Sequence, residues 1–141
     1  MPSRLTRLGC SLLLCLVSNL AWADVVVVTS AQSAVTTLSR SELADIYLGR
    51  NSRFPGGQPA TPVDQRENSP AYIAFYRHYL GQTPTQIKMH WSRLIFTGRG
   101  QPPHSEADNE TMADFIAQNS DAIGYLDNAY LDDRLQVVSI D

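Results

Sequence analysis

Cysteine is nearly absent from this 141-residue chain, and its two cysteines, Cys10 and Cys15, both lie close to the N-terminus. The rest of the chain therefore has neither disulfides nor thiol chemistry. A basic excess is also missing, since 11 Lys and Arg stand against 14 Asp and Glu, for a net charge of −3. Because proteins bind the phosphates of nucleic acids through a basic face, we expect no nucleic-acid partner.

Enzyme motifs are lacking as well. The chain has no Gly-x-Ser-x-Gly element, no obvious carboxylate dyad and no cysteine placed as a nucleophile. Its three histidines, His78, His90 and His104, do not follow the spacing of metal ligands. We therefore expect a protein that is not an enzyme and that uses neither a metal nor another cofactor.

The N-terminal residues have the pattern of a secretory signal peptide. Arg4 and Arg7 precede an apolar stretch, Leu8 to Leu20, which is shorter than the roughly 20 residues that span a bilayer. Ala21-Trp22-Ala23 then supplies a small-x-small cleavage site. This predicts removal of residues 1–23 and a periplasmic location. A lipoprotein anchored through Cys15 is the weaker alternative, because no small residue precedes that cysteine.

Cleavage before Asp24 would leave one α/β domain, residues 24–141. Loss of Arg4 and Arg7 leaves nine basic residues against 14 acidic ones, a net charge of −5. A chain of this length has room for one modest core. Its net charge gives no general attraction for anions, so any anion site must be local.

Predicted strands and helices alternate past Asp24. Runs of β-branched and apolar residues predict strands at Val25–Val28, Thr61–Gln65, Ala122–Leu126 and Leu135–Ile140. Capping residues predict helix starts at Ser39, Ser69 and Thr83, and a further helix covers about residues 109–118. The pattern indicates an α/β fold with a mixed central sheet flanked by helices.

Two helices carry predicted apolar stripes. Residues Tyr72, Phe75, Tyr76 and Tyr79 recur at helical spacing after Ser69, which predicts core packing with the tyrosine hydroxyls at the rim. In the next helix the expected buried stripe consists of Ile87, Trp91, Leu94 and Ile95.

The turn before the helix at Pro70 is the best candidate for chemistry. A helix N-terminus attracts anions through free N–H groups, and Ser69, Asn68 and Arg66 add a hydroxyl, an amide and a guanidinium. The alternative is that Ser69 only caps the helix while Arg66 and Glu67 face solvent.

Three other loops are weaker candidates. Ser30 and Ser33 follow the first strand and could line the same crevice, although they could equally be ordinary loop residues. The segment Thr97–Gly100 lacks the Gly-Lys-Ser/Thr ending of a phosphate loop, so we reject a nucleotide site there. The loops Asn51–Gly57, with Phe54, and Gly98–His104 are expected to be exposed and available to a partner.

Three segments in the right order resemble phosphate-binding periplasmic proteins of ABC importers. Leu38–Gly49 resembles the family's L-S-x-x-x-L-x-x-I-F-x-G segment, and Ala122–Tyr125 resembles its G-A-I-G-Y strand. The turn Gln65–Ser69 stands where the family has Arg-x-Asp-x-Ser-Gly-Thr. The resemblance implies a type 2 periplasmic-binding-protein fold, here reduced to the second lobe.

The family clasps phosphate with the side chains and amides of that last motif. Alignment on the serine gives Ser69 the family's serine and puts Glu67 at its aspartate, an acceptor that selects a protonated oxyanion. Pro70 and Ala71 replace the family's glycine and threonine, which removes an N–H and a hydroxyl.

Two functions of different class follow. The resemblance implies a periplasmic solute-binding module for phosphate or a similar small oxyanion, working with an ABC permease. The alternative is an interaction domain that keeps the fold without the ligand and docks onto another envelope protein or onto a second copy of itself.

Overall fold

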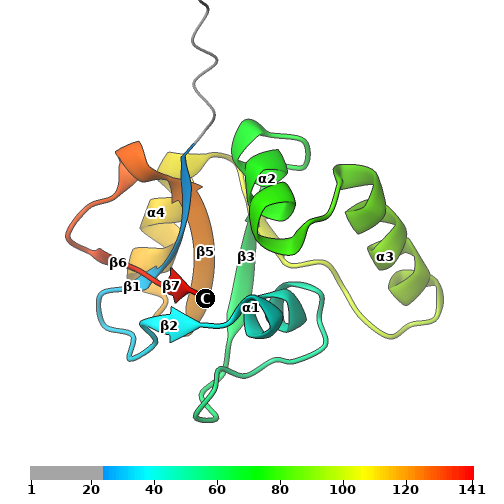
Figure 1. Ribbon diagram of the computed structural model, residues 1–141, viewed down its shortest axis with the longest axis horizontal. Coiled ribbons are helices and arrows are strands. Elements are labelled where there is room, and N and C mark those ends of the chain that lie inside the picture. The colour runs from blue at the N-terminus through cyan, green and yellow to red at the C-terminus, as the bar shows by residue number, and fades with distance from the viewer. Residues whose placement is uncertain (1–23) are drawn as a thin grey trace, which may run out of the picture.

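Residues 24–141 are described by the computed structural model, drawn as a ribbon in Figure 1. The predicted signal peptide, residues 1–23, lies outside the described residues. Within residues 24–141, no helix is both long enough and apolar enough to cross a membrane.

A five-stranded mixed sheet forms the centre, in the order β4-β3-β5-β1-β6. Its strands are β1 (Val25–Ser30), β3 (Thr61–Gln65), β4 (His104–Glu106), β5 (Ala122–Asp127) and β6 (Leu135–Val137). Strand β3 runs parallel to β4 and β5, whereas β1 runs antiparallel to β5 and β6. A separate parallel pair joins β2 (Thr37–Leu38) to β7 (Ser139–Ile140). The predicted mixed sheet is confirmed.

Helices cover both faces of this sheet, because successive side chains of its strands point in opposite directions. In β5, Ile123 and Tyr125 join one apolar cluster, with α1 (Arg40–Tyr47) and α2 (Pro70–Phe75). Leu126 belongs to a second cluster on the other face, against α4 (Asn109–Gln118). Within residues 24–141, the larger sheet thus has one apolar cluster on each of its two faces.

Helix α4 approaches β5 closely at Gly124. A Cβ atom there would lie 2.6 Å from Met112 Sδ and 2.9 Å from Ile116 Cδ1. The absence of a side chain at this position therefore sets the distance between helix and sheet.

The helix starts are those that the sequence predicts. Ser39 and Glu42 form a capping box, as do Thr83 and Gln86 at the start of α3 (Pro84–Phe96). Ser69 caps α2, which continues as a π-helical turn, η1 (Tyr76–Leu80), and ends at Gly81 with φ 64°. A glycine tolerates this left-handed conformation without a steric penalty.

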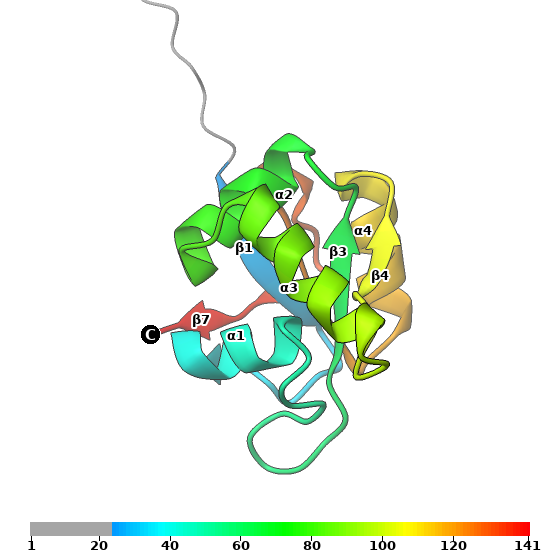
Figure 2. The same cartoon turned by 90° about the vertical axis from the view of Figure 1, so that its right-hand side faces the viewer.

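Helix α3 lies to one side of the sheet, beyond α2 (Figures 1 and 2). His90 Nε2 lies 2.9 Å from the carbonyl oxygen of Leu48, just past the end of α1. A Cβ atom at Gly49 would lie 3.0 Å from Trp91 Cη2, so the indole ring packs on the turn that follows α1. These contacts fix α3 against α1.

Several expectations about burial were wrong. Ile95 was expected in the buried stripe of α3 but is 55% exposed, because α3 contacts the core through Ile87, Trp91 and the partly buried Leu94. Phe54 was expected at an exposed contact loop but is buried, in the apolar cluster that also contains Leu43 and Ile46 of α1.

The short strands β2 and β4 were not predicted, since two or three residues carry no clear alternation.

Candidate functional site

The turn between β3 and α2 follows directly from the end of the sheet. Arg66, Glu67 and Asn68 are exposed in this turn, and Asn68 has a left-handed backbone with φ 65°. The backbone N–H of Ser69 donates to the Arg66 carbonyl at 3.0 Å, which closes the turn.

Hydrogen bonding at this turn is that of an ordinary helix cap. The Ser69 hydroxyl oxygen accepts from the Tyr72 N–H at 3.3 Å, and Pro70 has no N–H to offer. Two of the amides that an anion would use are thus occupied or missing. The capping alternative describes Ser69 well, and the turn by itself offers few donors.

Ser30 and Ser33 do not reach this turn. Strands β1 and β3 run in opposite directions on either side of β5. The C-terminal end of β1 and the C-terminal end of β3 therefore point to opposite sides of the molecule along the strand axis. Ser30 Oγ accepts from Gln32 N–H and Ser33 Oγ from Val35 N–H, so both hydroxyls close a local turn. The six predicted site residues therefore do not line one pocket.

A pocket of about 270 Å³ opens beside the turn, at the carboxyl end of β3. From the sheet side it is lined by Asp64, Gln65, Glu67, Tyr72 and Ser105. Its opposite wall is helix α3, which contributes Ile87, Lys88, Trp91, Ser92 and Ile95, and Pro102 and Pro103 complete the rim. In α/β sheets, ligands bind at the carboxyl ends of strands, so this pocket is the candidate site.

Asp64 is the buried acid of the site. Its two carboxylate oxygens accept hydrogen bonds from the Tyr125 hydroxyl at 2.6 Å and the Tyr76 hydroxyl at 2.7 Å. Burial raises the pKa of Asp64 to about 6, and the two hydrogen bonds, from Tyr125 and Tyr76, partly oppose that rise.

The tyrosines around Asp64 form a buried hydrogen-bonded group. The Tyr125 ring stacks on Phe75 with the centroids 4.0 Å apart, and the Tyr125 hydroxyl accepts from the Gln65 N–H at 3.1 Å. Burial raises the pKa of both Tyr76 and Tyr125 well above the ordinary tyrosine value, so both hydroxyls stay protonated as donors. The Tyr76 hydroxyl was expected at the rim of the core and is instead part of this centre.

Helix α3 supplies the cation of the pocket. Lys88 and Ser92 lie one helical turn apart and are exposed, so both can meet a solute that enters from solvent. Trp91 is buried in the pocket wall, and its indole N–H has no hydrogen-bond partner among residues 24–141. An unpaired buried donor of this kind is costly to the folded state.

Sequence reasoning missed most of the pocket. Of the six predicted residues only Glu67 lines it, while Asp64, Lys88 and Ser92 were not considered. One signal was present, since Asp64 is the single charged residue of the predicted strand Thr61–Gln65. No local pattern indicates that α3 packs beside that strand.

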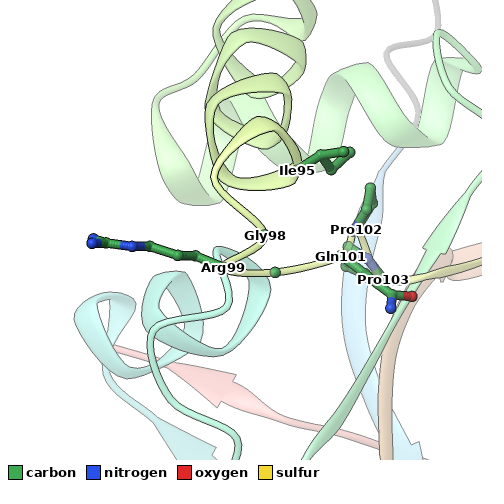
Figure 3. A pocket seen from close by; sticks show the side chains of 7 residues that line it. Ile95, Gly98, Arg99, Gln101, Pro102 and Pro103 are labelled. Carbon is green, nitrogen blue, oxygen red and sulfur yellow. The ribbon is translucent and has the colours of Figure 1, made fainter.

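A second hollow adjoins the first, because Ile95, Pro102 and Pro103 line both. Figure 3 shows Ile95 at the end of α3 facing Pro102, while the Arg99 side chain extends away from the prolines. The Gly98–Gly100 loop thus lacks the converging donors of a phosphate loop.

The fold matches solved structures of phosphate transport receptors. A structure described as a phosphate ABC transporter substrate-binding protein from Clostridium perfringens with bound phosphate matches with a TM-score of 0.65 and 22% identity. An ABC-type phosphate transport receptor from Vibrio cholerae matches with a TM-score of 0.66 and 17% identity. PstS from Borrelia burgdorferi gives a TM-score of 0.63 and 15% identity. These likenesses establish a periplasmic-binding-protein fold.

The match covers most of this chain and less than half of each larger protein. It includes 83–84% of the present residues and 45–47% of those chains. No protein-family model matches the sequence, and no curated protein matches it. The chain therefore shares the fold of these three proteins, and it spans less than half of their length.

Proposed function

We propose that residues 24–141 form a periplasmic domain that binds phosphate or a similar small oxyanion in the pocket between β3 and α3. One observation carries the proposal. The pocket at the carboxyl end of β3 combines the ammonium of Lys88 with the hydroxyls of Ser92 and Ser105. Donors of these kinds hold anions in proteins.

Acceptors in the same pocket favour an oxyanion that carries a proton. The Glu67 carboxylate lies at the rim and Asp64 at the base. A fully ionised anion would be repelled by both, whereas a protonated oxygen can donate to Glu67. Hydrogen phosphate meets this condition near pH 7 and sulfate does not, so the proposal includes a preference for phosphate over sulfate.

The other predicted residues do not bind the anion in this proposal. Arg66, Asn68 and Ser69 form the turn beside the pocket and hold Glu67 at its rim. Ser30 and Ser33 lie at the far edge of the sheet and have no part in it. The C. perfringens structure, which carries bound phosphate, supports an oxyanion ligand through its shared fold.

Isothermal titration of residues 24–141 with phosphate, and then with sulfate, tests the proposal. We expect saturable phosphate binding below about 1 mM, accompanied by a change in Trp91 emission, because that indole lies in the pocket wall. Sulfate should bind more weakly. Absence of phosphate binding in this range would overturn the proposal.

Two variants of α3 make the test specific. Lys88→Met removes the cation of the pocket and should weaken phosphate binding by about tenfold or more, the usual cost of losing a charged hydrogen bond. Arg93→Met removes an equal charge from the same helix outside the pocket wall and should leave affinity within about twofold. Equal effects of the two variants would mean that only general charge matters.

The proposal extends to the compartment and the partner. The signal peptide at residues 1–23 would deliver the domain to the periplasm, where an ABC permease would receive the solute. N-terminal sequencing of the exported protein should give Asp24 as the first residue. A first residue elsewhere would mean that cleavage occurs at another site.

A further inference from the structure

The outer face of α3 carries a stripe of exposed side chains, two of them apolar, that the solute site does not use. Met89, Arg93 and Phe96 follow i, i+4, i+7 spacing, so they lie along one side of the helix. Phe96 is 93% exposed and Met89 is 58% exposed. A phenylalanine this exposed leaves nearly all of its apolar surface in water, which favours a binding role.

The surroundings of this stripe are basic. Between residues 68 and 105 the chain has four basic residues and no Asp or Glu. Three of the four lie on α3 or directly after it, at Lys88, Arg93 and Arg99, and all three are exposed. None of them forms an ion pair within the described part of the chain. We call Met89, Arg93, Phe96 and Arg99 the basic pole.

A second exposed aromatic lies in surroundings of the opposite charge. Tyr130 is 47% exposed at the end of the 3-10 turn η2 (Asn128–Tyr130). Asp127 precedes that turn, and Asp132 and Asp133 follow it. From residue 106 to residue 141 there are nine acidic residues and a single basic one, Arg134. We call the segment Asp127–Asp133 the acidic pole.

The two poles lie at opposite ends of the molecule. In Figure 1, α3 is at the right edge, and the orange turn between β5 and β6 is at the left. Figure 2 agrees, since α3 is nearest the viewer and that turn lies behind the sheet. The basic pole of one molecule therefore cannot meet its own acidic pole, but it can meet that of another.

We propose that the basic pole docks onto the acidic pole of a second copy of this chain, so that molecules associate head to tail. Phe96 would pack against Tyr130 of the next copy, with Arg93 and Arg99 opposite Asp127 and Asp133, because Asp132 is already paired with Arg134. Both the apolar contact and the charges are complementary between the poles, whereas two copies of one pole repel each other. A contact between different surfaces leaves one free pole at each end, so it builds chains or closed rings.

Sedimentation velocity of residues 24–141 tests this association over about 10 µM to about 1 mM. We expect the weight-average sedimentation coefficient to rise with concentration at about 20 mM salt and to rise less at about 300 mM, because exposed charges are screened. A strict monomer under all of these conditions overturns the proposal.

Two single variants establish which surfaces meet. Phe96→Asp replaces the aromatic ring of the basic pole with an opposing charge, Tyr130→Arg does the same at the acidic pole, and each variant should be monomeric alone. Both side chains are largely exposed, so both variants should keep the circular dichroism spectrum of the parent. Ser41→Asp, at an exposed position on the first turn of α1 and outside both poles, is the matched control and should associate like the parent.

A mixture of the two monomeric variants gives the decisive result. Each retains one intact pole, so a 1:1 mixture should form dimers and nothing larger. If Tyr130→Arg associates normally while Phe96→Asp does not, the contact joins α3 to α3 and the head-to-tail proposal is wrong. If the chain stays monomeric but floats with anionic vesicles in a Phe96-dependent way, the stripe faces lipid and the proposal is also wrong.

Discussion

Protonation of Asp64 should control the stability of this domain. The carboxyl is buried at the end of β3 between the hydroxyls of Tyr76 and Tyr125, and its pKa rises from the ordinary value of 3.8 to about 6. Because the folded protein holds this proton more tightly than the unfolded chain, the stabilisation is fully present below pH 4. It is lost as the pH rises through 6.

The size of the effect follows from the two pKa values. A rise from 3.8 to about 6 corresponds to about 3 kcal/mol in all, at about 1.4 kcal/mol per pH unit. Between about pH 5 and about pH 7 the contribution of Asp64 to the free energy of unfolding should fall by about 1 kcal/mol. That is a measurable fraction of the stability of a domain of this size.

Urea unfolding at a series of pH values, for the parent and for Asp64→Asn, isolates this contribution. The amide cannot ionise, so the parent should lose about 1 kcal/mol relative to the variant between about pH 5 and about pH 7. Tyr76→Phe removes one of the two donors that oppose the rise, so it should move the transition to higher pH. A difference between parent and Asp64→Asn that does not change with pH, or that grows in favour of the parent, would refute the reasoning.

Three further substitutions test other parts of the structure. Gly124→Ala should destabilise the domain by about 1–3 kcal/mol, because the new methyl group overlaps Met112. An unchanged midpoint in thermal or urea unfolding would contradict the close approach of α4 to β5. Tyr47→Phe should cost about 1–2 kcal/mol, since the buried hydroxyl lies 3.0 Å from the Val63 carbonyl oxygen and 3.1 Å from that of Ile123. Ser69→Ala should lower the free energy of unfolding by about 1 kcal/mol through the lost cap, and calorimetry should show a phosphate affinity within about twofold of the parent. A large loss of affinity would instead mean that the anion binds at the turn itself.

Local features of the sequence predicted most of the helices and strands. The capping boxes at Ser39 and Thr83 and the serine-proline start at Ser69 were found where expected, because a cap involves residues within four positions of each other. The alternation in β5, with Tyr125 on one face and Leu126 on the other, depends only on the period of an extended chain. Family-like segments also indicated the fold that the solved structures share.

The site could be predicted only in part. Glu67 lies at the rim of the pocket, as the turn suggested, but the other wall comes from α3, whose position depends on contacts with the end of α1. The outward position of Ile95 has the same cause, because helical spacing shows which residues share a face and not which face meets the core.

The sequence by itself determined where the four α-helices begin, how the side chains of the longer strands alternate and which turn precedes α2, since all of these depend on neighbouring residues. Only the tertiary structure decided which segments meet. The antiparallel pairing of β1 with β5, about 100 residues apart in the chain, placed Ser30 at the edge of the sheet opposite Ser69. Packing of Tyr76 and Tyr125 around Asp64 buries its carboxyl group and raises its pKa, because desolvation depends on every element that surrounds a group.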